Sequence, residues 1–189
     1  MTEETKHWQS IKDGDVTSLQ ALYDFYVGPM YSYGMTLCHD EDKVKDSIHD
    51  LFLTLWEGRK NFAIPASGKA YLFVSLRRRI FDKGTKLQTM TGSLDQVTEA
   101  DFLSTGHEEQ WIKLEEDSLQ EQKLASALSR ITERQREIIH MKYYQQLEYE
   151  EIAQVMGLNY QSARNLVNRA LIALRKEMLL IVTLLLMFT

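Results

Sequence analysis

Apolar residues in the first forty positions recur at intervals of three and four, the spacing that places side chains on one face of an α-helix. The run begins near Leu19 and continues through Leu22, Tyr23, Tyr26, Met30, Tyr33 and Leu37. A Gly28-Pro29 pair falls in the middle, and proline removes a backbone donor and crowds the preceding turn. The pattern therefore predicts one long helix that is bent or interrupted at this pair.

A second amphipathic pattern follows in the segment DEDKVKDSIHDLFLTLWEGRKNF. Its apolar side holds Val44, Ile48, Leu51, Phe52 and Leu55, and its opposite side holds Asp46, His49, Asp50 and Leu53. Asp40 or Asp42 is suited to cap the start of such a helix, and Gly58 is suited to end it. We therefore expect an amphipathic helix with one buried apolar side and one exposed, mostly polar side.

A loop containing Pro65 and Gly68 precedes a third helix, which we expect to begin near residues 67–69 and to end at about Gly84. The apolar contacts of this helix are expected from Tyr71, Val74, Leu76 and Phe81, and its basic turn contains Arg77, Arg78, Arg79 and Lys83. Consecutive arginines point in different directions around a helix, so they cannot all contact one partner. These charges either keep the protein soluble and pair with acidic residues, or join nearby aromatic rings in binding melted DNA.

The composition changes after Lys86. Residues 87–118 are polar and rich in Asp and Glu, and their apolar residues are too sparse to build a core. We therefore predict an acidic linker that becomes helical near its end. For the chain as a whole, the formal net charge of -5 argues against nucleic-acid binding. The acidic linker accounts for that sum, however, and the flanking segments are near neutral or basic on particular faces.

The last third of the chain returns to helical patterns. SLQEQKLASALSRI predicts one helix, and Thr132 is placed to cap a second over ERQREIIHMKYY. The stretch LEYEEIAQVMGLNYQSARNLVNRALIALR then indicates a short helix, a tight turn at residues 157–159 and a longer helix. Ala153 falls where the two helices would cross, Gly157 where the turn takes a left-handed backbone, and Ala163 where the second helix docks. This spacing predicts a helix-turn-helix.

The second helix of this pair is expected to expose Tyr160, Gln161, Arg164, Asn165 and Asn168. Gln and Asn can pair with adenine edges, Arg can pair with guanine edges or phosphate, and a helix fits the major groove. A merely solvated helix face has a similar composition and is the commoner explanation for an arbitrary pair of helices. The spacing of the small residue, the glycine and the apolar residue, together with Asn159 as a cap, favours DNA binding.

Composition agrees with a folded, mostly helical protein. The 189 residues are 44% hydrophobic and 26% charged, and two prolines with nine glycines leave little material for a β-sandwich. The single Cys38 excludes a disulfide framework and a cysteine-rich zinc site, so we expect a reducing, cytoplasmic location. No metal-ligand or phosphate-binding pattern is recognisable, so we also expect no metal and no cofactor. The N-terminal residues show no signal-peptide pattern.

The C-terminus is an uncharged run, MLLIVTLLLMFT, from Met178 to Thr189. As a helix it would span roughly 18 Å, against about 30 Å of bilayer hydrocarbon. We therefore expect no stable membrane insertion. Packing against the preceding helices and contact with a partner both remain open as explanations of this tail.

These segments, taken in order, resemble the extracytoplasmic function (ECF) sigma factors, a short two-domain group within the sigma-70 family of bacterial RNA polymerase sigma factors. The resemblance covers roughly residues 18–176. KVKDSIHDLFLTLWEGRKNF is similar to region 2.2, with His49 where glutamine is common, and AYLFVSLRRRIFDK is similar to regions 2.3 and 2.4, with Arg78 in place of a frequent asparagine. ALSRITERQREIIHMKYYQQLEYEEIAQVMGLNYQSARNLVNRALIALR resembles region 4 nearly throughout.

The resemblance implies an all-α fold of two small helical domains joined by an acidic linker. Region 2 is expected at residues 10–86, the linker at 87–118, region 4 at 119–178 and the apolar tail at 179–189. The implied function is promoter-specific transcription initiation with RNA polymerase core, without catalysis by this chain. The implied partners are the clamp helices and flap of the core, promoter DNA, and an anti-sigma factor as a further candidate.

The resemblance also implies three groups of site residues. Region 4 would read the -35 element with Tyr160, Gln161, Ser162, Arg164, Asn165, Asn168 and Arg169. Region 2 would capture an unstacked base of the -10 element with the loop 61–69 and hold the DNA backbone, using Asn61, Lys69, Tyr71, Arg77, Arg78, Arg79 and Lys83. The polymerase core would be contacted by Asp46, His49, Asp50 and Leu53.

Two other functions are considered. A conventional helix-turn-helix regulator would pair the same C-terminal motif with an N-terminal helical sensor domain, but no ligand pocket or phosphoacceptor pattern is recognisable. An enzyme would need a nucleophile, a phosphate-binding loop or a set of metal ligands, and the sequence shows none of these patterns. We therefore expect a non-enzymatic transcription factor.

Overall fold

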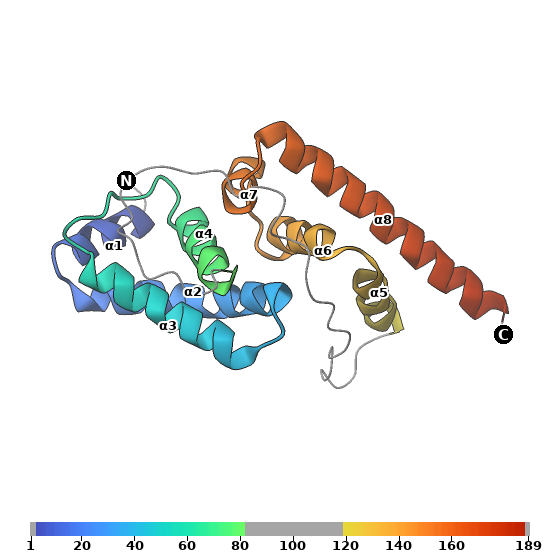
Figure 1. Cartoon of the computed structure of the whole chain (residues 1–189), viewed down its shortest axis with the longest axis horizontal. Coiled ribbons are helices and arrows are strands. Elements are labelled where there is room, and N and C mark those ends of the chain that lie inside the picture. The colour runs from blue at the N-terminus through green and yellow to red at the C-terminus, as the bar shows by residue number, and fades with distance from the viewer. Residues whose placement is uncertain (1–2, 82–118, 188–189) are drawn as a thin grey trace.

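The computed structural model describes the backbone of residues 3–81 and 119–187, and the side-chain surroundings of residues 5–81 and 122–179. All regular elements in these ranges are helical, which confirms the predicted all-α fold. The N-terminal group comprises α1 (Glu3–Lys12), α2 (Val16–Leu37), α3 (Glu41–Glu57) and α4 (Gly68–Phe81). The C-terminal group comprises α5 (Leu119–Arg130), α6 (Glu133–Ile139), the π-helical turn η2 (His140–Tyr144), α7 (Tyr149–Met156) and α8 (Tyr160–Met187) (Figure 1).

The sequence predicts a bend or an interruption of α2 at the Gly28-Pro29 pair; the helix runs through the pair, so the interruption does not occur. Burial on both sides of the pair explains its continuity. Tyr26 lies before the proline and Met30 and Tyr33 follow it, and all three side chains are almost fully buried in the core. Their packing compensates for the backbone hydrogen bond that Pro29 cannot make, so the helix continues.

The ends of α3 and α4 follow from local hydrogen bonds. The Asp40 carboxylate accepts from the Lys43 amide at 3.0 Å, and Gly58 ends α3, as the sequence predicts. Ser67 begins α4 in the same way, because its hydroxyl accepts from the Ala70 amide at 3.1 Å. The end of α4 that was expected near Gly84 lies outside the described residues.

Helix α1 was not expected from the sequence, yet it completes the core of the N-terminal group. Trp8 and Ile11 are 1% and 0% exposed. The Trp8 ring meets the rings of Phe62 and Tyr71 edge to face, with centroids 5.8 and 5.6 Å apart. This contact joins α1 to the loop before α4 and to α4 itself.

In the C-terminal group, Thr132 caps α6 with a full capping box, in which its hydroxyl accepts from the Gln135 amide and the Gln135 side chain accepts from the Thr132 amide. The predicted helix over ERQREIIHMKYY changes to a π-helical turn at His140. Helix α8 continues into the apolar tail as far as Met187. Within the part of the chain that the structure describes, no helix is long and apolar enough to cross a membrane.

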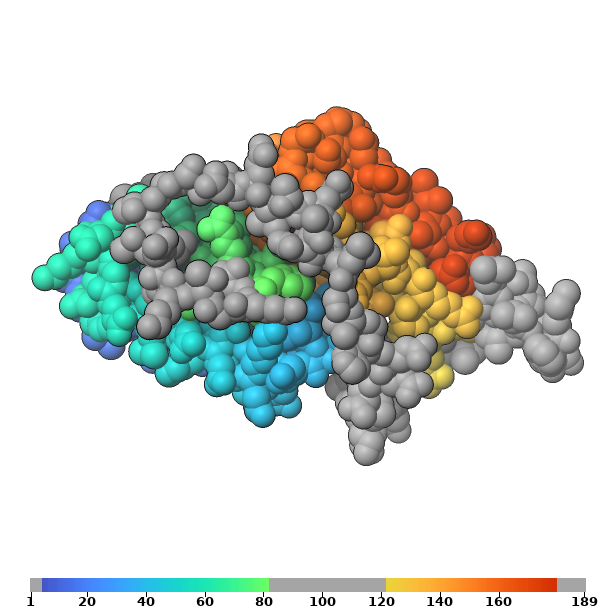
Figure 2. Space-filling model, viewed as in Figure 1, coloured from blue at the N-terminus to red at the C-terminus, as the bar shows by residue number. Residues whose placement is uncertain are grey.

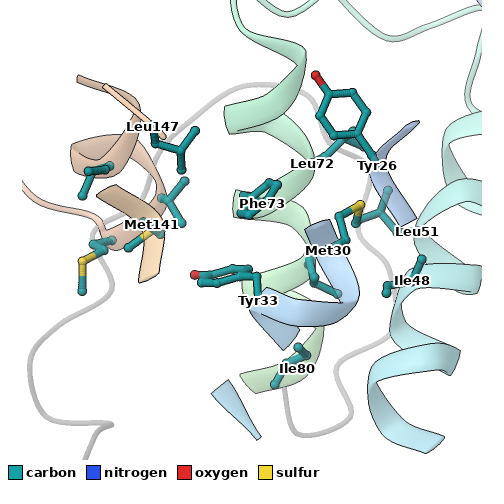
Figure 3. Packing of buried hydrophobic residues seen from close by; sticks show 14 of the residues in the cluster. Tyr26, Met30, Tyr33, Ile48, Leu51, Leu72, Phe73, Ile80, Met141 and Leu147 are labelled. Carbon is teal, nitrogen blue, oxygen red and sulfur yellow. The ribbon is translucent and has the colours of Figure 1, made fainter. Parts of the chain in front are cut away.

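The two groups of helices share one hydrophobic core. Helix α4 packs along α7, and α2 contacts α6 and η2 (Figure 1). Figure 3 shows Tyr33 of α2 and Phe73 of α4 on the side of the N-terminal group that faces Met141 and Leu147. Their rings are stacked with centroids 5.0 Å apart. The sequence did not predict this direct packing of the two groups.

Candidate nucleic-acid interface

The turn between α7 and α8 has the backbone geometry that the sequence predicts. Gly157 takes a left-handed conformation with φ of 63°. The amide of Leu158 then donates to the Ala153 carbonyl at 2.8 Å, which ends α7. The Asn159 side chain accepts from the Ser162 amide at 2.7 Å and so starts α8.

Small residues bring the two helices of this motif together. Ala153 on α7 is 7% exposed, and Ala163, Val167 and Ala170 on α8 are 0%, 1% and 0% exposed. Short side chains at the crossing allow close approach of the helices, and the buried stripe on α8 fixes which side of that helix faces outward. The helix-turn-helix predicted from the sequence is therefore present.

The outward side of α8 gathers the residues predicted to read DNA. Tyr160, Gln161, Arg164, Asn165, Asn168 and Arg169 are exposed, and Ser162 is half-buried. The Gln161 amide group donates to the Asn165 side-chain oxygen at 3.1 Å, so these two residues orient each other. Tyr160 rests edge to face on Tyr149 of α7, with ring centroids 5.9 Å apart. Figure 2 shows the first turns of α8, in orange, on the outer surface at the top of the view.

The four residues predicted to contact the polymerase core lie on the exposed side of α3. Asp46, His49 and Asp50 are exposed, and Leu53 is 46% exposed. The opposite side of α3 is buried against α2 and α4, as the amphipathic pattern predicts. The structure thus gathers an acidic surface with one apolar residue, which we call the α3 face.

The basic residues of α4 are largely engaged within the protein. The Arg77 guanidinium is paired with the Glu137 carboxylate of α6 at 2.8 Å, and both side chains are buried. The guanidinium of Arg79 donates to the Thr54 hydroxyl of α3 at 2.7 Å. Burial lowers the pKa of Arg79 from its usual value, while the charge of nearby Asp50 acts in the opposite direction.

The other residues predicted at the -10 site are found in different surroundings. Arg78 and Asn61 are exposed. Tyr71 is half-buried against Trp8, and burial raises the pKa of its phenol. The Lys69 ammonium donates to the backbone carbonyl of Gln145 in the C-terminal group. Lys83 lies outside the described residues.

Several buried polar residues were not singled out from the sequence. Glu137 accepts from Arg77 and from the Tyr33 hydroxyl, and His140 and Gln145 are also buried between the two groups of helices. The one available signal was the position of Glu137 in the apolar run REIIHM, where a buried carboxylate requires a partner. Among the residues whose side chains are described, no three His, Cys, Asp or Glu residues are gathered in a way that could hold a metal ion.

Comparison with known proteins places this chain beside sigma factors. The family described as Sigma-70, region 4 matches residues 121–174, a segment that contains α6, α7 and the outward residues of α8. The ECF RNA polymerase sigma factor SigL of Mycobacterium tuberculosis is 26% identical over 163 residues, which cover 83% of this chain and 86% of SigL. RNA polymerase sigma factor YlaC of Bacillus subtilis is 22% identical, over 92% of this chain and 94% of YlaC.

Solved structures share the fold at lower identity. CnrH, in complex with the cytosolic domain of CnrY, superposes with a TM-score of 0.62 at 15% identity, over 92% of this chain and 95% of CnrH. The sigma factor RpoE of Bartonella quintana, in complex with the anti-sigma factor NepR, gives a TM-score of 0.56 at 19% identity, over 86% and 97% of the two chains. The region 4 match, the relatives that cover most of the chain and the observed helix-turn-helix together confirm the resemblance of this chain to the ECF sigma factors of the sigma-70 family.

Proposed function

We propose that this chain binds RNA polymerase core and directs it to promoters that carry a -35 and a -10 element. The outward side of α8 reads the -35 element, and the loop 61–69 with α4 binds the melted -10 element. The α3 face docks on the clamp helices of the core, and the C-terminal helices contact its flap. Promoter recognition is then the whole contribution of this chain, and the bond-forming chemistry belongs to the polymerase.

The first turns of α8 carry this proposal. Six polar or aromatic side chains predicted to read bases are exposed together there, and they start at the Asn159 cap, within the segment matched by sigma-70 region 4. A helix that presents Gln, Asn and Arg from its first turns has the donors and acceptors that the edges of bases in the major groove require.

The comparisons also support the remaining parts of the proposal. The sigma-factor relatives cover more than four fifths of this chain, including the N-terminal helices, so a conventional regulator with a separate sensor domain is not favoured. RpoE was solved with an anti-sigma factor, and we propose that a protein of this kind also binds this chain. We further propose that the chain acts in the cytoplasm, where the polymerase is found, and that it has no enzymatic activity.

Transcription with purified components tests this function. Core polymerase alone should not initiate at a promoter of this chain, and specific transcripts should appear when the chain is added. Replacing Asp46 by lysine on the α3 face should weaken core binding, whereas the same replacement at the exposed Asp24 of α2 should not. The proposal would be contradicted if the chain only regulated specific promoters while another sigma factor initiated their transcription.

A further inference from the structure

Helix α8 has two parts with different chemistry. As far as Glu177 it is amphipathic, with one side packed on α5, α6 and α7 and a polar side that stays exposed. From Met178 the backbone remains helical to Met187, but the sequence from residue 178 to the end contains no charged residue. The helix therefore continues for about three turns after its polar side has ended.

Large apolar side chains are already exposed where this uncharged run begins. Ile172, Met178 and Leu179 are 66%, 36% and 60% exposed. Ile172 and Leu179 are seven residues apart and so lie on the same side of the helix, and the exposed Arg175 and Lys176 fall between them on that side. Figure 1 shows the red end of α8 extending beyond α5 and the other coloured helices. The described part of the chain therefore leaves the start of the run uncovered.

The sequence of the run indicates what kind of surroundings would bury it. Residues 178–187 read MLLIVTLLLM, in which Thr183 is the one polar residue. A helix that docks in a groove of a folded protein, or on a second copy of itself, needs a single apolar stripe with a spacing of three and four residues. A helix that is apolar on every side needs apolar surroundings on every side. The hydrocarbon of a lipid leaflet provides them, whereas a groove does not.

The length of the run and the charges before it also fit a lipid leaflet. Ten helical residues span about 15 Å, half of the roughly 30 Å of bilayer hydrocarbon, so the run fits within one leaflet without crossing the membrane. Arg175 and Lys176 are exposed directly before it, where basic side chains can reach the phosphates of anionic lipids. The neighbouring Glu177 lies 3.9 Å from Arg130 of α5 instead. Because the whole chain has a net charge of -5, attraction to an anionic surface requires a local basic pair of this kind.

We propose that the end of α8 is a lipid-binding element, which places residues 178–187 in one leaflet of an anionic membrane and Arg175 and Lys176 among its headgroups. The contact is reversible, because so short a segment buries far less apolar surface than a membrane-spanning helix. It requires neither polymerase nor DNA, so it is independent of the proposed function in transcription. It gives the chain a second surface to bind, at the end of α8 opposite to the residues predicted to read bases.

Flotation of the purified full chain with lipid vesicles tests this contact. Vesicles of phosphatidylcholine and phosphatidylglycerol in equal amounts present an anionic surface, and vesicles of phosphatidylcholine alone present a neutral one. The chain should float with the anionic vesicles and less strongly with the neutral ones. Replacing both Arg175 and Lys176 by glutamine should lower the affinity for anionic vesicles by about fivefold for each charge removed. The same double variant should bind neutral vesicles as the unaltered chain does.

A matched pair of substitutions tests the apolar part of the contact. Leu179→Gln should lower the affinity for both kinds of vesicle by on the order of tenfold, because an amide replaces an apolar side chain that enters the hydrocarbon. Ile172→Gln makes the same kind of change two turns earlier, before the basic pair, and should leave the affinity unaltered. Both side chains are exposed in the structure, so both variants should fold, and circular dichroism checks this. Equal effects of the two substitutions would contradict insertion that begins at Met178.

Sedimentation of the chain without lipid distinguishes the other ways of covering this run. A chain that floats with vesicles and sediments as a monomer supports the lipid-binding element. A stable dimer that Leu179→Gln dissociates, in a chain that does not float, would show that a second copy covers the run and would overturn the proposal. A monomer that floats with neither kind of vesicle would overturn it as well. None of these outcomes depends on transcription, so a chain that never floats can still direct promoter-specific initiation.

Discussion

At the scale of single residues, this protein places ionisable side chains in two contrasting settings. The outward side of α8 keeps its polar groups in water, where they can exchange hydration for contacts with bases. Arg77, Glu137 and His140 are instead removed from water, and each is held by specific partners. The exposed polar groups suit recognition of a nucleic acid. The buried ones make the contact between the two groups of helices sensitive to changes of charge.

His140 should make stability depend on pH. Burial lowers the pKa of its imidazole from 6.5 to about 4, so between these values the unfolded chain binds more protons than the folded one. The stabilisation is complete above pH 6.5 and is lost as the pH falls toward 4, by up to about 3 kcal/mol. Urea unfolding across this range measures the effect.

A matched histidine provides the control for this dependence. In His140→Gln, the loss of stability that His140 causes between pH 6.5 and 4 should disappear. In His49→Gln, which changes an exposed position of α3, this loss should persist. The carboxylates titrate alike in all three proteins, so the difference isolates His140. An identical pH profile for His140→Gln and the unaltered chain would show that His140 is not the group responsible.

Arg164 should contribute to promoter choice. It is exposed on the second turn of α8 beside the Gln161–Asn165 pair. If it pairs with a guanine edge, Arg164→Ala should cost about 1–3 kcal/mol of discrimination at one base of the -35 element. Competition between promoter variants in the presence of core measures this loss, and core affinity should not change.

Arg175→Ala is the matched control, because this arginine is also exposed on α8 but lies about three turns further along the helix. It should leave the base preference unaltered. Equal effects of the two substitutions would mean that Arg164 contributes only general positive charge.

At the scale of secondary structure, short-range signals determine where helices begin and end, and burial determines whether they continue. Asp40, Ser67, Thr132 and Asn159 each accept from an amide in the first turn of a helix. Gly34 permits the close packing of α2 on α3, since a Cβ there would lie 2.5 Å from Val44 Cγ1. These details place the α3 face and the outward side of α8 on rigid helices.

The turn of the helix-turn-helix should tolerate asparagine better than alanine at Gly157. A Cβ at this position meets nothing within 4 Å, so only the left-handed backbone opposes substitution. Gly157→Ala should therefore destabilise the protein by about 1–2 kcal/mol, and Gly157→Asn by less, because asparagine adopts this conformation more readily. Thermal unfolding of both variants measures the difference, and a larger cost for asparagine would contradict this explanation.

At the scale of the whole molecule, the sequence predicts what depends on neighbouring residues and misses what depends on distant ones. The all-α fold, the caps of α3 and α6, and the Gly157 turn follow from local patterns. The burial of Arg77 does not, because its partner Glu137 is 60 residues away in the chain. A run of three arginines has the same sequence pattern whether it faces DNA or a carboxylate of the same protein.

Other misses have the same origin. Trp8 enters the core through contacts with Phe62 and Tyr71, which no periodicity around residue 8 reveals. The continuity of α2 through Pro29 depends on burial against α3 and α4, which outweighs the local preference of proline to break a helix. The exposed residues of α8 could be predicted from the sequence, because they follow from the helical period and from the position of the preceding turn.

We propose, at this scale, that the chain gives RNA polymerase core its choice of promoters. The most direct measurement is transcription of fragmented genomic DNA by purified core, with and without the chain, followed by sequencing of the RNA 5′ ends. We expect a set of start sites that appears only with the chain and shares two sequence elements, near -10 and -35. Start sites that do not change when the chain is added would contradict this account.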